Sequence, residues 1–232
     1  MGLYWRPTDK RARLLATARD QHGRDIHHCS PLTNLKLIRD RSNLQLCRAR
    51  HDGQLEIWTK LNFYLYEKMV LFYCTLLAMK HQDARGIPRD DLVDRFELET
   101  ENGEQELYGG CMVTAEGQKH ALRLFRDHSS GVVRLEACAL RGPMKDIPLW
   151  TAFVTRYVGD PDWVQPMRGG IVSLAVLKPP PYVFLSRYRV PHESNGEYLI
   201  RFDSTEGATF DTLHGCSMLT VHRRCSFCGA MD

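Results

Sequence analysis

The sequence predicts a mainly β protein of the α+β class, in which strands pair antiparallel and helices are few. Two observations carry this prediction. Short apolar runs of strand length recur along the chain, and Gly or Pro lies in nearly every gap between those of the second half. One longer run, from Tyr66 to Lys80, instead places its apolar residues at helical spacing. With 232 residues, 43% of them hydrophobic, the chain can bury an ordinary core.

The first expected element is a basic flexible arm over residues 1–30. Residues 1–25 carry six Lys or Arg against three Asp, which accounts for the whole formal net charge of +3. Apolar periodicity is weak, so we expect a mobile segment with at most a short helix around Arg11 to Arg19. The start lacks the pattern of a secretory signal, and most of the eight cysteines lie in apolar runs, as in a reducing compartment. We therefore expect a cytoplasmic protein, with a nuclear location left open.

Residues 31–82 are predicted to form a small unit of three strands and a helix. The strands are expected at Leu35 to Arg39, Leu44 to Arg48 and Leu55 to Phe63. Asp52-Gly53, between the last two, is a hairpin signal. The helix from Tyr66 to Lys80 is apolar on nearly every side. Because a unit of this size is rarely stable alone, we expect it to dock on the rest of the chain through that helix.

An acidic linker is predicted over residues 83–106. It contains nine Asp or Glu against three Arg, and it is interrupted by Gly86, Pro88 and Gly103. This composition is typical of a solvated connector. The alternative is an acidic docking segment for a basic partner.

Residues 107–214 are predicted to form the main domain, with seven antiparallel strands and a closing helix from Ser204 to His214. Asn195-Gly196 before the last strand is a turn signal, and Ser204 is a suitable helix cap. The strands are expected at Leu107 to Val113, Ala121 to Arg126, Val132 to Leu140, Leu149 to Tyr157, Ile171 to Leu177, Tyr182 to Val190 and Glu197 to Phe202.

This order of seven strands and one helix resembles the pleckstrin-homology-like (PH-like) domain. The segments Tyr66 to Thr75, Leu107 to Gly110 and Pro148 to Phe153 also resemble those of filamentous-fungal proteins that carry such domains. The resemblance implies a seven-stranded antiparallel barrel with a C-terminal capping helix, preceded by a partial copy over residues 31–82. A weak internal repeat, in which Leu37 to Ser42 resembles Leu124 to Ser129, hints at duplication.

The resemblance implies a non-catalytic interaction or scaffold module that binds a protein segment. The expected groove lies between the closing helix and the strand Ile171 to Leu177 or Tyr182 to Val190, where related folds add a peptide strand. No motif for a nucleophile, a phosphate-cradling loop or a catalytic metal was found, so no enzyme activity and no cofactor are expected. The balance of 31 basic and 28 acidic residues gives no reason to expect specific nucleic-acid binding.

The alternative function is targeting to phosphoinositides or an acidic membrane surface. Members of the fold that bind these lipids gather Lys and Arg around the first hairpin, and the matching residues here are Lys119, Arg123 and Arg126. The spacing departs from the family pattern, because residues three apart on a strand point to opposite faces.

A second alternative concerns the cysteine-containing tail, residues 215–232. Cys225 and Cys228 have the two-residue gap of a zinc knuckle, and Cys216 and His222 could complete four ligands for an assembly site. One such pair is a weak signal. We therefore predict that the tail of the isolated chain holds no metal.

Overall fold

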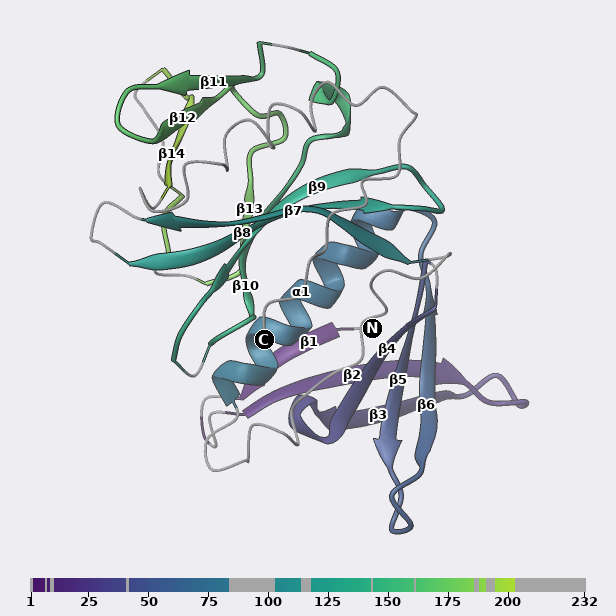
Figure 1. Ribbon diagram of the computed structural model, residues 1–232. Coiled ribbons are helices and arrows are strands. Elements are labelled where there is room, and N and C mark those ends of the chain that lie inside the picture. The colour runs from purple at the N-terminus through teal and green to yellow at the C-terminus, as the bar shows by residue number, and fades with distance from the viewer. Residues whose placement is uncertain are drawn as a thin grey trace.

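The computed structural model describes residues 2–6, 8, 11–40, 42–83, 103–113, 118–142, 144–160, 162–185, 188–190 and 195–202. One long helix, α1 (Tyr66–Asp83), lies between two groups of strands (Figure 1). The first unit, residues 2–83, contains two three-stranded sheets, and the second unit, residues 103–202, contains an eight-stranded sheet. Within the described residues, no helix has the length and apolar character needed to cross a membrane.

The first unit begins with a sheet where the sequence predicted a flexible arm. Its strands are β1 (Gly2–Arg6), β2 (Arg11–Arg19) and β3 (Asp25–Pro31), paired in that order. The prediction of a short helix around Arg11 to Arg19 is therefore wrong. Along β2, Ala12 and Leu14 are fully buried while Arg11 and Arg13 on the other face are partly exposed. This alternation of buried and partly exposed residues indicates a strand, but the many basic residues of the arm led to the prediction of a flexible segment.

The rest of the first unit follows the prediction for residues 31–82. A short 3-10 helix, η1 (Leu32–Asn34), leads into a second antiparallel sheet that crosses the first (Figure 1). Its strands are β4 (Leu35–Asp40), β5 (Asn43–Ala49) and β6 (Leu55–Asn62). The predicted turn is confirmed, because Gly53 has a φ of 76° and its N–H donates to the Arg50 carbonyl over 3.0 Å.

Helix α1 is buried on nearly every side, as its composition predicted. Met69, Val70 and Leu76 belong to the core of the first unit, and Phe153 and Phe184 of the second unit pack against the same cluster. Figure 1 shows α1 running between the sheets of the two units. The prediction that the first unit docks on the second through this helix is confirmed.

Each of the seven segments predicted as strands in the main domain contains a strand. The observed bounds are β7 (Glu104–Val113), β8 (Lys119–Asp127), β9 (Val133–Ala139), β10 (Pro148–Phe153), β12 (Ile171–Leu174), β13 (Tyr182–Val183) and β14 (Tyr198–Phe202). An eighth strand, β11 (Val164–Met167), was missed. It is short and contains Pro166, a residue that argues against a central strand but is tolerated at a sheet edge, where β11 lies.

The eight strands are arranged in the order β11-β12-β14-β7-β8-β9-β10-β13, and over the described residues this sheet does not close into the predicted seven-stranded barrel. The predicted capping helix from Ser204 to His214 lies outside the described residues, as do the tail, 215–232, and the greater part of the acidic linker, 84–102. The two ends of the predicted linker belong to other elements, since Asp83 ends α1 and Glu104 begins β7.

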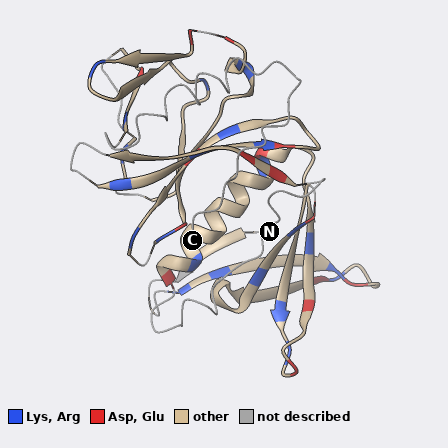
Figure 2. Ribbon diagram, in the orientation of Figure 1, with Lys and Arg blue, Asp and Glu red and all other residues tan. Residues whose placement is uncertain are grey.

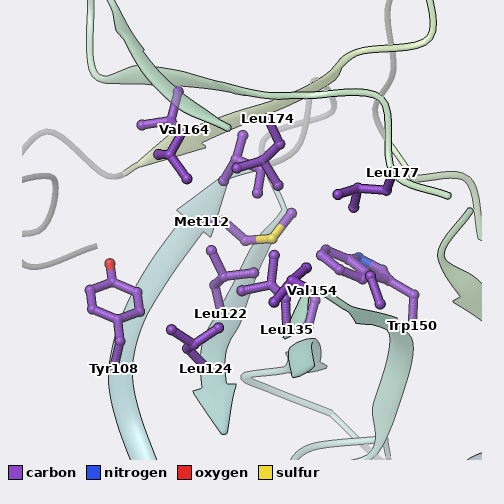
Figure 3. Packing of buried hydrophobic residues seen from close by; sticks show 14 of the residues in the cluster. Tyr108, Met112, Leu122, Leu124, Leu135, Trp150, Val154, Val164, Leu174 and Leu177 are labelled. Carbon is purple, nitrogen blue, oxygen red and sulfur yellow. The ribbon is translucent and has the colours of Figure 1, made fainter. Parts of the chain in front are cut away.

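The core of the second unit forms where the two halves of this sheet face each other. Figure 3 shows Met112, Leu122 and Leu135 beside Trp150, with Leu174 of β12 and Leu177, which follows that strand, above them. All six side chains are almost completely buried. This core holds β8 and β9 in a fixed register, and so fixes the positions of the residues at their ends.

Candidate functional site

A hollow of about 550 Å³ opens at one end of the second unit, where β8 begins and β9 ends. Its lining residues are Gln118, Lys119, His120, Ala139, Leu140 and Arg141. Because the two strands are antiparallel, the first residues of β8 lie beside the last residues of β9, and His120 is paired with Ala139. Three of the residues that line the hollow, Lys119, His120 and Arg141, therefore belong to basic residue types.

The structure separates the three cations that were predicted to bind phosphate. Lys119 lines the hollow. Arg123 is held among carboxylates, since its guanidinium lies 4.0 Å from Glu106 and 3.9 Å from Asp146. Arg126 is exposed and, three positions from Arg123, it projects from the opposite face of β8. Of the three predicted residues, only Lys119 contributes to the hollow.

Two residues of the hollow, His120 and Arg141, were missed from the sequence. The His120 side chain is almost completely buried, and its ring meets the Tyr188 ring edge to face at 5.5 Å between centroids. Arg141 is exposed and follows the predicted strand Val132 to Leu140 directly. The signal for Arg141 was its position, because the residue after the third strand of a meander lies beside the start of the second strand.

A second polar cluster, the ionic layer, lies on the face of β7, β8 and β9 that is turned toward α1. It consists of Glu104, Asp127, Arg134 and Glu136, all almost completely buried. Arg134 donates to both carboxylate oxygens of Glu104, over 2.6 Å and 2.8 Å, and it also pairs with Glu136. Burial by itself lowers the pKa of Arg134, but the two glutamates together raise it well above its ordinary value.

The ionic layer joins the two units rather than forming a reactive centre. Arg39 of β4 pairs with Asp127 of β8, and both side chains are 1% exposed. Burial and the charge of Glu136 raise the pKa of the Cys74 thiol, and the same two causes raise that of Cys138. Both thiols therefore stay protonated and are poor nucleophiles.

Figure 2 shows that acidic and basic residues are spread over both units.

The sheet edges predicted to accept a peptide strand differ in what they offer. The strand predicted at Ile171 to Leu177 forms β12, which is paired with β11 on one side and with β14 on the other, so it has no open edge. The strand predicted at Tyr182 to Val190 is reduced to β13, whose two residues lie at an edge of the sheet and are exposed. The closing helix of the predicted groove lies outside the described residues.

The predicted zinc ligands Cys216, His222, Cys225 and Cys228 also lie outside the described residues, so the zinc alternative stays a prediction. Where the structure is described, no group of three or more His, Cys, Asp or Glu side chains is placed to hold a metal ion.

Two protein-family models match the chain, one over residues 1–99 and the other over residues 105–215. Both are described as a PH domain found in tandem in fungal proteins. No curated protein and no solved structure matches the chain. PH domains are generally non-catalytic interaction modules that bind proteins or phosphoinositides. The matched ranges contain the two units that meet at α1, and the chain therefore belongs to the family of fungal proteins with tandem PH domains.

Proposed function

We propose that this chain is a non-catalytic interaction module whose second unit binds a phosphate-bearing group, such as a phosphoinositide headgroup, in the hollow between the ends of β8 and β9. One observation carries the proposal: Lys119, His120 and Arg141 line a single hollow. Lys and Arg side chains form strong, charge-assisted hydrogen bonds with phosphate oxygens.

The surroundings of the hollow favour a local contact with a headgroup over general attraction to an acidic membrane. The predicted main domain, residues 107–214, carries twelve basic and eleven acidic residues, so its net charge is small. Arg123 is held by Glu106 and Asp146 and so adds little to the attraction. Affinity should therefore depend on the residues of the hollow and fall as salt is raised.

Sedimentation of the full chain with lipid vesicles tests this proposal. Vesicles of phosphatidylcholine with a phosphoinositide should carry the protein down, and vesicles without it should not. Lys119→Ala combined with Arg141→Ala should abolish that difference. Arg126→Ala is the matched control, because Arg126 is an exposed cation on the same strand but outside the hollow. Soluble inositol phosphate is added as a competitor, to distinguish binding of a lipid headgroup from binding of a free phosphate compound. Equal sedimentation of the double variant and the control would overturn the proposal.

Recognition of a protein segment, the function favoured first from the sequence, is the second candidate for the second unit. The observation in its favour is the position of β13 at a sheet edge, where Tyr182 and Val183 are exposed. A comparison of proteins captured by the full chain and by its Val183→Lys variant tests it. A partner that binds both forms equally would exclude this edge.

A further inference from the structure

Three consecutive prolines followed by a tyrosine lead from β12 into β13 and lie at the surface of the second unit. Pro179 and Pro180 are exposed, and Pro181 is partly exposed. Tyr182, the first residue of β13, is 38% exposed. We call residues 179–182 the proline segment. It belongs neither to the hollow nor to the ionic layer.

The proline segment is fixed at both of its ends. Before it, Leu177 is 2% exposed and points into the core of the second unit (Figure 3). The Lys178 N–H donates to the Tyr157 hydroxyl oxygen over 2.9 Å. After the segment, the Phe184 N–H donates to the Leu149 carbonyl over 2.9 Å. A partner that binds the segment therefore has little chain to order.

The prolines favour a backbone that is extended but does not join the sheet. A proline has no N–H to donate to a neighbouring strand, and the pairing of β13 with β10 is confined to Tyr182 and Val183. Each proline also restricts the residue before it to extended backbone, so a run of three favours the polyproline II helix. This helix has three residues per turn, so residues three positions apart, such as Pro179 and Tyr182, project from the same side.

We propose that the proline segment is the recognition site for a WW domain of a partner protein. WW domains bind extended proline-rich segments in a groove lined by aromatic side chains. The order Pro-Pro-x-Tyr, which residues 179–182 have, suits a groove that takes proline rings and a tyrosine ring side by side. In this contact the chain is the ligand and the partner supplies the groove, unlike in the addition of a peptide strand at β13. The proposal does not depend on phosphate binding in the hollow.

The residues around the segment favour a WW domain over an SH3 domain, which also reads proline. An SH3 ligand has two prolines three positions apart, and none of these three prolines has another at that distance. The tyrosine is available to the groove. The Tyr182 ring meets the Phe153 ring at 6.2 Å between centroids, so it is supported on one side while part of it stays exposed. Because β13 pairs through only two residues, a groove that takes the whole ring disturbs little of the sheet.

Titration of the full chain with a panel of purified WW domains that bind Pro-Pro-x-Tyr peptides tests the proposal by isothermal calorimetry. We expect binding, and Pro180→Ala and Tyr182→Ala should each weaken it about tenfold, because each removes a ring that the groove contacts. Pro166→Ala and Tyr64→Ala are the matched controls, an exposed proline and an exposed tyrosine outside the segment, and should leave the affinity unchanged. A purified SH3 domain should not bind.

Thermal melts show whether the variants fold, and Pro180→Ala decides the matter if Tyr182→Ala unfolds for lack of its contact with Phe153. A synthetic peptide of residues 174–185 is titrated with the same WW domains. If the peptide binds and the full chain does not, the segment is covered in the folded protein and the proposal is overturned. It is also overturned if no WW domain binds the full chain, if Pro180→Ala binds as tightly as Pro166→Ala, or if the SH3 domain binds as tightly as the WW domains.

Discussion

The buried pairing of Arg134 with Glu104 and Glu136 makes the stability of the protein sensitive to the loss of any one of these three charges. A buried ion pair contributes little compared with an apolar replacement, but the loss of one partner leaves the other charge buried and unpaired, at a cost of about 3–5 kcal/mol. Glu104→Gln should therefore lower the free energy of unfolding by about that amount, measured by urea denaturation of the full chain. Arg19→Gln is the control, since Arg19 and its partner Asp25 are both largely exposed, and the control should leave the midpoint unchanged. Equal midpoints for the two variants would contradict this assignment.

At the same scale, the candidate phosphate ligands chosen from the sequence include one of the three basic residues that line the hollow, Lys119, and not His120 or Arg141. Lys119 was selected because it lies near the first hairpin of the main domain, where the family places its cations. Arg141 was missed because it comes from a different strand, and only the register of β8 against β9 brings the two residues together. Arg123 was selected for the same reason as Lys119, and the sequence did not show that Glu106 and Asp146 lie beside it.

Among the elements, α1 is where truncation of a side chain should be most costly. Leu76 is 1% exposed and belongs to the core of the first unit, so Leu76→Ala should cost about 2–5 kcal/mol of unfolding free energy. Phe72→Ala should cost less, because Phe72 is only partly buried against Phe63, at 5.6 Å between ring centroids. Lys68→Ala on the exposed side of the helix is the control. Chemical denaturation monitored by circular dichroism measures all three. An unchanged midpoint for Leu76→Ala would show that α1 is not a core element.

The elements that the sequence predicted correctly are those with a strong period. The helical spacing of Tyr66 to Lys80 and the seven apolar runs of the second unit were sufficient to place α1 and those strands. The sheet β1-β2-β3 was missed because, in β2, the basic residues Arg11 and Arg13 alternate with only two fully buried residues, Ala12 and Leu14. The apparent repeat was misleading in detail. It matched Leu37 to Ser42, in and beyond β4, with Leu124 to Ser129, in and beyond β8, and the order of elements makes β11 the counterpart of β4. The duplication itself is shown by the two PH-domain matches.

At the scale of the whole molecule, the structure joins two PH units through a shared helix and a buried ion pair instead of a long solvated connection. α1 belongs to the first unit by sequence, yet side chains from the second unit complete its burial. Arg39 and Asp127 come from different units and are buried together. The hollow between the ends of β8 and β9 lies on the second unit, whose contact with the first includes this buried ion pair.

The shared burial predicts that the two units unfold as one. If each were an independent domain, heating would give two transitions, and a change in one unit would move only its own transition. Here the loss of either unit exposes the apolar face of α1 and leaves Arg39 or Asp127 without its partner, so neither unit should persist alone. Scanning calorimetry of the full chain should show a single transition whose calorimetric and van't Hoff enthalpies agree. Arg39→Met should shift that whole transition downward, because the buried Asp127 carboxylate then lacks its counter-charge. Two resolved transitions in the unaltered chain, or an Arg39→Met effect confined to one of them, would mean that the joint does not couple the units.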